Sequence, residues 1–452
     1  MELNSANRIY FLGIGGIGMS ALARFLKING ANVAGYDKTP SEITDNLLSE
    51  GINVHFEDNS DLIPFEPELV IYTPAIPNDL GEFNYLEDQG IPFVKRSEAL
   101  GYISKNIFTI AVAGTHGKTT ISSMITHILK SSDIAVTGFV GGICVNYNSN
   151  LILSQNSKYM VVEADEYDRS FLRLFPDIAI ISAMDADHLD IYGDEDYLLQ
   201  SFFLFSEQIK ENGKLILKSE LEASPRLKVP IIRYGREKES AIQAVNIRIE
   251  NNKNCFDLMY NGHLISGFEI NQPGHHNVEN ATAAIVASHS IGLNFDLIRS
   301  ALYSYQGVKR RFDIKVNSSS NIYIDDYAHH PEEIRATIQA VRMMFPDKKI
   351  CGIFQPHLFS RTRDLAVGFA ESLALLDDLI LLDIYPAREK AISGITSDWL
   401  LQQIDMTSKR VIPYDNIISY ISENKPDLLL TIGAGDIDRL VDPLQQLLSK
   451  NI

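Results

Sequence analysis

The segment Gly114–Thr120, with the sequence Gly-Thr-His-Gly-Lys-Thr-Thr, has the residue types of a phosphate-binding loop. It follows the apolar run Ile107–Val112 and precedes the amphipathic segment Ile121–Leu129, so it connects a predicted strand to a predicted helix. Backbone N–H groups at a helix start bind polyphosphates, the Lys118 side chain reaches the outer phosphate oxygens, and the Thr119 hydroxyl binds Mg²⁺. The segment therefore predicts a nucleotide site.

The spacing of this loop is irregular. A standard Walker loop has a glycine five residues before its Gly-Lys pair, and Val112 occupies that position here. The structural alternative is an ordinary helix start with a threonine cap. Because Gly-Lys-Thr-Thr after a buried strand is a rare way to begin a structural helix, we favour the phosphate site.

Two carboxylate clusters follow two further strand candidates downstream of the loop. Glu163–Glu166 comes after the apolar run Tyr159–Val162, and Asp185–His188 comes after Ile178–Ser182. Ligands bind at the carboxyl ends of strands in open α/β sheets, and hard oxygen ligands suit Mg²⁺. Charge runs in loops are usually only solvated, but two clusters at successive strand ends favour a metal and phosphate site.

Two polar motifs lie further along the chain. His276–Asn280 precedes a small-residue helix, Ala281–Ser288, and its amide and imidazole groups can bind an adenine or a ribose. Asn277 can equally be a helix cap, and the sequence leaves both interpretations open. Arg310–Phe312 offers two guanidinium groups to phosphates, against the alternative of ordinary surface arginines.

A second pair of strand-end clusters occurs in the last third of the chain. Asp325–His330 lies before a helix that begins at Pro331, and Gln355–Arg363 follows another strand. Such a pair predicts a site for a small anionic substrate. Arg361 can form a forked contact with a carboxylate, and His329 or His357 can orient an amine or take its proton.

The N-terminal region has a glycine-rich turn, Gly13–Gly18, with the pattern G-x-G-x-x-G. The turn separates the predicted strand Ile9–Leu12 from the predicted helix Ser20–Ile28, and Asp37 closes the next strand, Val33–Tyr36. This arrangement is typical of dinucleotide binding. Taken alone the signal is weak, but it supports a rival function, that of a nicotinamide-dependent oxidoreductase.

The elements that position these motifs alternate between strands and helices, which predicts an α/β fold. We expect three domains, at residues 1–106, 107–311 and 312–452, each built on a mainly parallel sheet with flanking helices. The first and last are predicted to be Rossmann-like, and the central one to be of the P-loop ATPase type. The segment Ala244–Ile270, with turns at Asn251-Asn252 and Asn261-Gly262, predicts an antiparallel appendage of the central domain. The other strands that we predict are Leu69–Thr73, Phe93–Val94, Tyr323–Ile324, Ile350–Phe354, Leu379–Leu382 and Leu428–Ile432.

Composition excludes several classes of protein. The 452 residues carry 40 Lys+Arg and 58 Asp+Glu, and the net charge of -18 disfavours nonspecific binding to nucleic acid or to anionic membranes. No signal peptide and no membrane-spanning apolar run is evident, so we expect a cytoplasmic protein. The three cysteines lie far apart, which argues against a disulfide framework or a zinc cluster.

Together the motifs resemble the Mur ligases, in order and over nearly the whole chain. The resemblance is strongest to the alanine-adding branch, and it explains the irregular loop. The family motifs are matched at Gly114–Thr120, Glu163–Glu166, Asp187–His188, His276–Asn280, Arg310–Phe312, Asp325–Pro331 and Gln355–Thr362.

The resemblance implies an ATP- and Mg²⁺-dependent ligase that joins L-alanine to the carboxylate of UDP-N-acetylmuramate through an acyl phosphate, in peptidoglycan precursor synthesis. The first domain would bind the UDP sugar, the second ATP and the third the amino acid, with a monomer or homodimer as the assembly. The implied catalytic residues are Lys118, Glu163, His188, Arg311 and His329. The implied metal ligands are Thr119, Glu163 and His188. The implied nucleotide-binding residues are Gly114, Thr115, His116, Gly117, Lys118, Thr119, Thr120, His276, Asn277, Asn280 and Arg311. The implied substrate-binding residues are Gly13, Gly15, Gly16, Gly18, Met19, Ser20, Asp37, Thr73, Ala75, Tyr327, His329, His357 and Arg361.

The sequence departs from the family pattern at two places. Several relatives carry a carbamoylated lysine after the Asp-His motif, and the region near Ser201 has none. Some members have arginine where this chain has Leu358, which leaves more of the carboxylate recognition to Arg361 and His357. Two alternatives remain besides the oxidoreductase: a related ligase that attaches a recycled peptide, and a non-catalytic nucleotide-binding or assembly protein.

Overall fold

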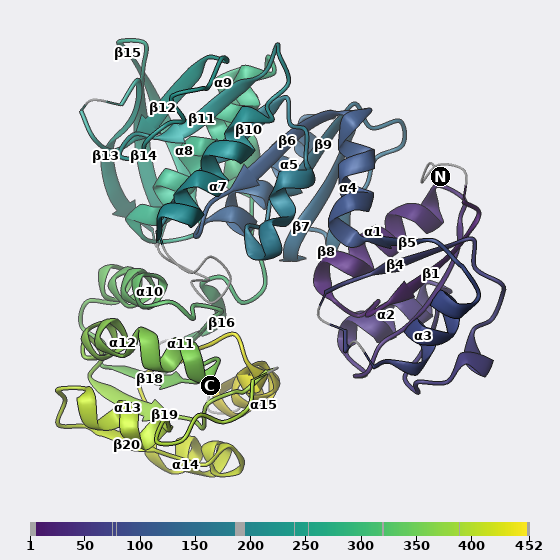
Figure 1. The fold of residues 1–452 in the computed structure, drawn as a ribbon. Helices are drawn as coiled ribbons and strands as arrows, with labels where there is room; N and C mark the ends of the chain where they lie inside the picture. Colours follow the sequence, from purple (N-terminus) through teal and green to yellow (C-terminus); the bar gives the residue numbers. More distant parts are fainter. Residues whose placement is uncertain are drawn as a thin grey trace. The chain divides into compact units, whose positions relative to one another are not determined.

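The computed structural model describes residues 6–74, 76–77, 79–185, 195–238, 240–251, 253–318, 321–387 and 389–449 (Figure 1). The described residues form three β-sheets, of five, ten and six strands. They fall into two compact units, the first made of Met1–Asn246, Phe256–Glu269 and Glu279–Gln306, and the second of Ile247–Cys255, Ile270–Val278 and Gly307–Ile452.

The first sheet is parallel throughout, in the order β3-β2-β1-β4-β5. The order reverses between β1 and β4, which is where ligands bind in open α/β sheets. Its strands are β1 (Arg8–Leu12), β2 (Asn32–Tyr36), β3 (Asn53–His55), β4 (Leu69–Tyr72) and β5 (Phe93–Lys95), and the helices of this region are α1 (Ile17–Ile28), α2 (Glu42–Ser49), the 3₁₀ helix η2 (Ser60–Leu62), α3 (Gly81–Asp88) and α4 (Arg96–Lys105).

The central sheet has the order β15-β14-β13-β12-β11-β10-β6-β9-β7-β8. Its pairs from β13 to β7 are parallel, and β7 pairs with β8 in the antiparallel sense. The strands are β6 (Phe108–Ala113), β7 (Val136–Cys144), β8 (Ser149–Ile152), β9 (Tyr159–Glu163), β10 (Ile178–Ile181), β11 (Lys214–Lys218), β12 (Ile231–Gly235), β13 (Ile242–Glu250), β14 (Lys253–Tyr260) and β15 (His263–Ile270), and the helices are α5 (Lys118–Ser131), the 3₁₀ helix η3 (Tyr167–Arg173), α7 (Glu195–Glu207), α8 (His275–Ser290) and α9 (Phe295–Ser304).

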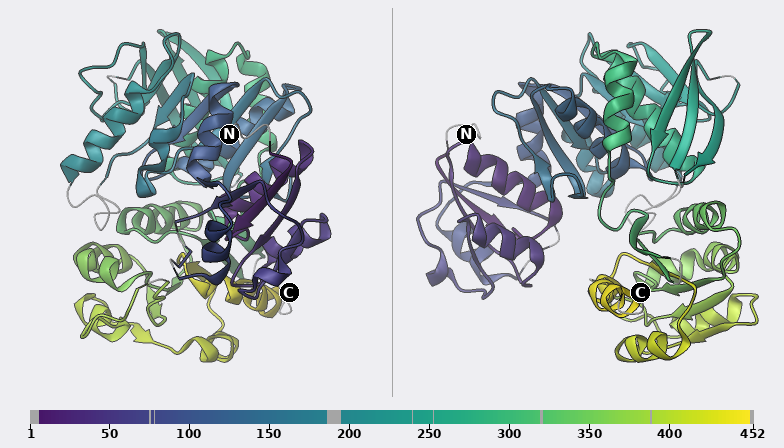
Figure 2. Two further views of the ribbon diagram at one scale, coloured as in Figure 1. Left: turned by 45° about the vertical axis from the view of Figure 1, so that its right-hand side comes forward. Right: turned by 180° about the vertical axis from the view of Figure 1, so that it is seen from behind.

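The third sheet has the order β16-β17-β21-β18-β19-β20 and is parallel except for the β16–β17 pair. Helices cover both of its faces (Figures 1 and 2). The strands are β16 (Asp313–Asn317), β17 (Ile322–Asp326), β18 (Ile350–Phe354), β19 (Asp378–Leu381), β20 (Lys409–Val411) and β21 (Leu428–Ile432), and the helices are α10 (Pro331–Met344), α11 (Phe359–Asp364), α12 (Ala366–Leu373), α13 (Ser397–Gln403), η4 (Tyr414–Asn416), α14 (Ile417–Asn424), η5 (Asp436–Leu440) and α15 (Val441–Ser449).

Strand periodicity decides which residues enter which hydrophobic core, because successive side chains of a strand point to opposite faces of its sheet. In β18, Ile350 and Phe354 join the core formed with α10, α12 and α13, whereas Cys351 and Ile353 join the core formed with α14 and α15. A strand buried on both faces reads as a continuous apolar run, which is why the sequence identified β18 with its full bounds.

The predicted fold class is confirmed: all three sheets are mainly parallel and carry flanking helices. The predicted appendage is also present, since β13, β14 and β15 are successive neighbours at one edge of the central sheet. Asn261 and Gly262 between β14 and β15 both have positive φ, of 48° and 78°, as a tight hairpin turn requires.

Several strands were not predicted from the sequence, and β7 is the clearest example. Its glycines interrupt the apolar pattern on which strand prediction depends. Gly138 is needed because α5 packs closely: a Cβ there would lie 2.6 Å from Oγ1 of Thr126.

No helix within the described residues has the length and apolar character that crossing a membrane requires.

Candidate active site

The phosphate-binding loop connects β6 to α5 and has a backbone that only glycine adopts easily. Gly114 and Gly117 have φ of +136° and +83°. A Cβ at Gly114 would lie 2.9 Å from the backbone nitrogen of Ala183, and one at Gly117 would lie 2.6 Å from Oδ1 of Asn280. No side chain caps the start of α5. The loop therefore has the close backbone approach and the open helix N-terminus that a polyphosphate requires.

The acidic residues of two strand ends meet this loop, as predicted, because β9 and β10 are the parallel neighbours of β6. Lys118 Nζ donates hydrogen bonds to both carboxylate oxygens of Glu166, each at 2.8 Å. From the end of β10, the Asp185 backbone nitrogen donates to Thr115 Oγ1 at 3.1 Å, and Ser182 Oγ donates to the His116 carbonyl.

The residues predicted to bind Mg²⁺ bring together a hydroxyl and a carboxylate. Thr119 Oγ1 lies 3.0 Å from each oxygen of Glu163, and the Gly141 backbone nitrogen donates to Glu163 Oε2 at 2.8 Å. Hard oxygen donors of this kind fit Mg²⁺, which keeps several waters and phosphate oxygens as its other ligands. The described residues include no group of three His, Cys, Asp or Glu side chains that could hold a metal ion. The predicted ligand His188 lies outside the described residues, as does Asp187.

The predicted nucleotide-binding motif His276–Asn280 lies within α8, which begins at His275 and therefore earlier than the predicted helix. Asn277 is in the first turn rather than at the cap, and its side chain donates to the Pro273 carbonyl at 2.8 Å. Asn280, one turn further on, is next to Gly117 of the loop.

The glycine turn of the first sheet is closed by its own backbone. The Gly13 and Ile14 nitrogens donate to the Tyr36 carbonyl at 2.8 and 3.0 Å. Asp37, predicted as a ligand-binding carboxylate, accepts a hydrogen bond of 2.7 Å from the Gly15 nitrogen. Its carboxylate thus fixes the turn at the position where the acidic residue of a dinucleotide fold meets a ribose.

Thr73, Met19 and Ser20 are further predicted residues of this turn that the structure describes. Thr73 lies against Gly13, where a Cβ would be 2.8 Å from Thr73 Cγ2. Met19 and Ser20 lie on α1 and are buried, and Ala75 lies outside the described residues.

Arg96 also lies at the glycine turn, although the sequence did not predict it. Its guanidinium lies over the start of α1, with Nη1 2.6 Å from where a Cβ of Gly18 would be. A cation here is suited to an anion at the glycine turn. The available signal was a basic pair directly after the predicted strand Phe93–Val94.

The third sheet carries the Arg-Arg-Phe motif next to the end of β17. Asp325 accepts a hydrogen bond of 3.1 Å from Arg310 and one of 2.7 Å from Thr431. Asp326 accepts hydrogen bonds from the backbone nitrogens of Phe312 and Ala328, at 2.7 and 2.8 Å. Burial raises the pKa of Asp326 to about 6, although Arg311 lowers it. These two aspartates fasten the motif to the strand end.

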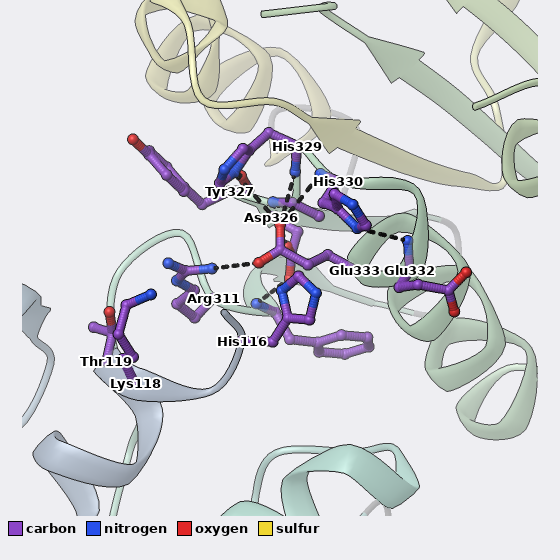
Figure 3. A network of polar contacts seen from close by, with 12 residues as sticks. His116, Lys118, Thr119, Arg311, Asp326, Tyr327, His329, His330, Glu332 and Glu333 are labelled. Atoms are coloured by element: carbon purple, nitrogen blue, oxygen red, sulfur yellow. Dashed lines mark hydrogen bonds and ion pairs between the residues drawn. The ribbon is translucent and has the colours of Figure 1, made fainter. Parts of the chain in front are cut away.

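Around this anchor, the predicted substrate residues of the third sheet come together. The Tyr327 ring lies beneath both guanidinium groups, 5.3 Å from that of Arg310 and 5.0 Å from that of Arg311. Arg311 lies 3.9 Å from Glu333, and His329 lies 3.4 Å from the same carboxylate (Figure 3).

A second strand end completes this cluster. The rings of His329 and His357 are 6.4 Å apart, and Tyr385, which the sequence analysis missed, stacks on His357 at 5.7 Å. Arg361 is on the short helix α11, which begins two residues after His357. The pairing of β17 and β18 with β21 places both strand ends at one edge of the sheet, which is why the two motifs meet.

Comparison with known proteins agrees with this geometry. Three family models match, the "Mur ligase family, catalytic domain" at residues 8–107, the "Mur ligase middle domain" at 112–288 and the "Mur ligase, glutamate ligase domain" at 310–435. The chain belongs to the Mur ligase family. This membership decides against the nicotinamide-dependent oxidoreductase.

Relatives that match along their whole length carry one particular name. UDP-N-acetylmuramate–L-alanine ligases from Flavobacterium johnsoniae and Porphyromonas gingivalis are each 46% identical, over 100% of this chain and 100% of the first, and over 98% of this chain and 99% of the second. The crystal structure of a UDP-N-acetylmuramate-alanine ligase from Thermotoga maritima is 27% identical, covers 98% of this chain and 100% of its own, and has a TM-score of 0.83. A murein peptide ligase from Psychrobacter arcticus shares the fold, with 24% identity and a TM-score of 0.70.

Proposed function

We propose that this chain is the ATP-dependent ligase that joins L-alanine to the carboxylate of UDP-N-acetylmuramate, releasing ADP and phosphate, in peptidoglycan precursor synthesis. The observation that carries the proposal is the meeting of Lys118, Thr119 and Glu163 at the carboxyl ends of β6 and β9, in a chain that is similar along its whole length to ligases of that name. Phosphoryl transfer requires groups that bind the phosphates and a carboxylate that binds the metal ion, and a phosphate loop with a carboxylate at the next strand end provides both.

In this mechanism the muramate carboxylate attacks the γ-phosphorus of ATP, which gives an acyl phosphate and ADP. The α5 N-terminus binds the phosphates, Lys118 neutralises charge on the transferred group, and Asn280 beside Gly117 contacts the nucleotide. Thr119 and Glu163 would hold Mg²⁺, which, when bound, would supply further neutralisation of the phosphate charge. The L-alanine amine then attacks the acyl carbon, and phosphate leaves.

The third sheet binds the amino acid. Arg361 contacts its carboxylate, and His329 and His357 lie where an amine can be oriented between two imidazoles. Arg311, held by Tyr327 and Glu333, supplies a cation for the phosphate.

The domain roles complete the proposal. Residues 1–106 bind the UDP sugar, with the pyrophosphate at the glycine turn, residues 107–311 bind ATP, and residues 312–452 bind L-alanine. The protein works in the cytoplasm, where ATP is available, as a monomer or homodimer.

Isotope transfer tests the reaction. With ¹⁸O in the muramate carboxylate, one labelled oxygen must appear in the released phosphate, because that oxygen leaves with phosphorus when the amine displaces it. Unlabelled phosphate, or AMP as the product, contradicts the acyl-phosphate route. Competition among L-alanine, glycine, L-serine and a tripeptide tests the acceptor: preferred use of the tripeptide would replace alanine addition by peptide recycling.

A further inference from the structure

Glu166 is a buried carboxylate at the phosphate loop to which the proposed reaction gives no role. It follows β9 at the start of η3, three residues after Glu163. Its side chain is only 1% exposed, and that of its partner Lys118 is 13% exposed. An ion pair so far removed from water is weakly screened, so each partner has a strong influence on the other.

The contacts of Lys118 use all of its hydrogen-bonding capacity. An ammonium group has three donors. Lys118 Nζ donates to Oε1 and Oε2 of Glu166 at 2.8 Å each, and to the Gly114 carbonyl at 2.7 Å. A phosphate oxygen can therefore bind this ammonium only if one of the present partners is given up.

Glu166 is the partner that is able to leave. The Gly114 carbonyl belongs to a backbone with φ of +136°, closely packed against Ala183, so it cannot move without the loop. Glu166 is instead held through rotatable side-chain bonds, and its negative charge repels an incoming phosphate.

We propose that Glu166 is a positioning residue that acts as an exchangeable counter-ion of Lys118. In the nucleotide-free enzyme it holds the ammonium inside the loop, and the phosphates beyond the α-phosphate displace it when the nucleotide binds. This inference rests on the proposed function, because it takes ATP as the ligand. It has a measurable consequence: the ion pair must be broken at the expense of nucleotide affinity, so weakening the pair tightens nucleotide binding.

Glu166→Gln tests the exchange, because the amide is isosteric and carries no charge. Dissociation constants are measured by calorimetry at saturating Mg²⁺ for AMP, ADP and a non-hydrolysable ATP analogue. We expect ADP and the analogue to bind about tenfold more tightly to the variant, the size of one hydrogen bond to a charged group, and AMP to bind as it does to wild type. A merely structural role would shift all three nucleotides together.

Asp165→Asn is the matched control, since it removes the same charge from the neighbouring position. A gain in ADP affinity as large as that of Glu166→Gln would show a general effect of charge and would overturn the exchange. Unchanged or weaker ADP binding by Glu166→Gln, or an equal gain for AMP, would also overturn it.

Glu166→Asp keeps the test decisive if the amide variant does not fold. The shorter side chain retains the charge but cannot reach Lys118 with both oxygens, so we expect a smaller gain in ADP affinity. No gain overturns the inference. Wild-type enzyme that binds no ATP contradicts the proposed function instead, whereas wild-type enzyme that turns over while neither variant gains affinity contradicts the exchange alone.

Discussion

Gly141→Ala is expected to damage the proposed metal site without damaging the fold. Gly141 lies on β7 and donates its backbone N–H to Glu163 Oε2 at 2.8 Å. An added Cβ would lie 2.7 Å from Glu163 Cδ, 2.9 Å from Oε1 and closer still to Oε2, so the carboxylate cannot keep its position. The backbone itself tolerates alanine, because Gly141 is not among the described glycines with positive φ.

The size of the effect follows from the contacts that are lost. When the Glu163 carboxylate rotates away, it gives up the Gly141 hydrogen bond and its 3.0 Å contacts with Thr119. A hydrogen bond to a charged group contributes about 1.5–3 kcal/mol, which corresponds to a loss of roughly tenfold to a hundredfold in kcat/KM. The Mg²⁺ concentration that gives half-maximal activity should rise as well.

The assay is ADP release at several Mg²⁺ concentrations, with the thermal unfolding midpoint measured alongside. Gly235→Ala is the matched control, because it makes the same change in a strand of the same sheet, where the added Cβ approaches no atom closer than 3.2 Å. A Gly141→Ala enzyme with wild-type kcat/KM and wild-type Mg²⁺ dependence would refute the assignment of Glu163 as a metal ligand.

Three further predictions address the nucleotide site, the packing of α1 and the pH dependence of stability. Lys118→Ala should abolish turnover while UDP-sugar binding, measured by calorimetry, stays near the wild-type value; loss of both would mean that the loop has collapsed. Asn150→Ala should lower the free energy of unfolding by about 1–3 kcal/mol, because its buried side chain donates to the backbone and to Ser20 of α1 and accepts from Arg24; an unchanged denaturation midpoint would contradict this. Burial raises the pKa of Glu82 to about 7 from its ordinary value of 4.5, so the folded state binds the proton more tightly and stability falls as pH rises from about 4.5 to 7. Glu82→Gln keeps an oxygen for the Tyr10 hydroxyl and should flatten this fall in urea titrations, whereas an unchanged pH profile would refute it.

Prediction from sequence worked where the signal is local. Apolar runs identified β1, β18 and β21 almost to the residue, and the cap residues of α10 gave its start at Pro331, because strand periodicity and helix capping depend on near neighbours in the chain. Prediction failed for β7, whose glycines are explained only by the closeness of α5 and of Glu163.

The sequence by itself identified candidate residues for the chemistry and predicted that they lie at strand ends, because motif spacing and hydrophobic periodicity can be read from the chain without the structure. It also determined the family, through the order of those motifs. Only the tertiary structure decided which of these side chains contact one another. Lys118 and Glu166 are 48 residues apart in sequence, and Glu163 meets Thr119 across 44 residues. Such pairs depend on the order of the strands in the sheet, here β10-β6-β9-β7, and that order is set by packing of the whole domain rather than by any local pattern.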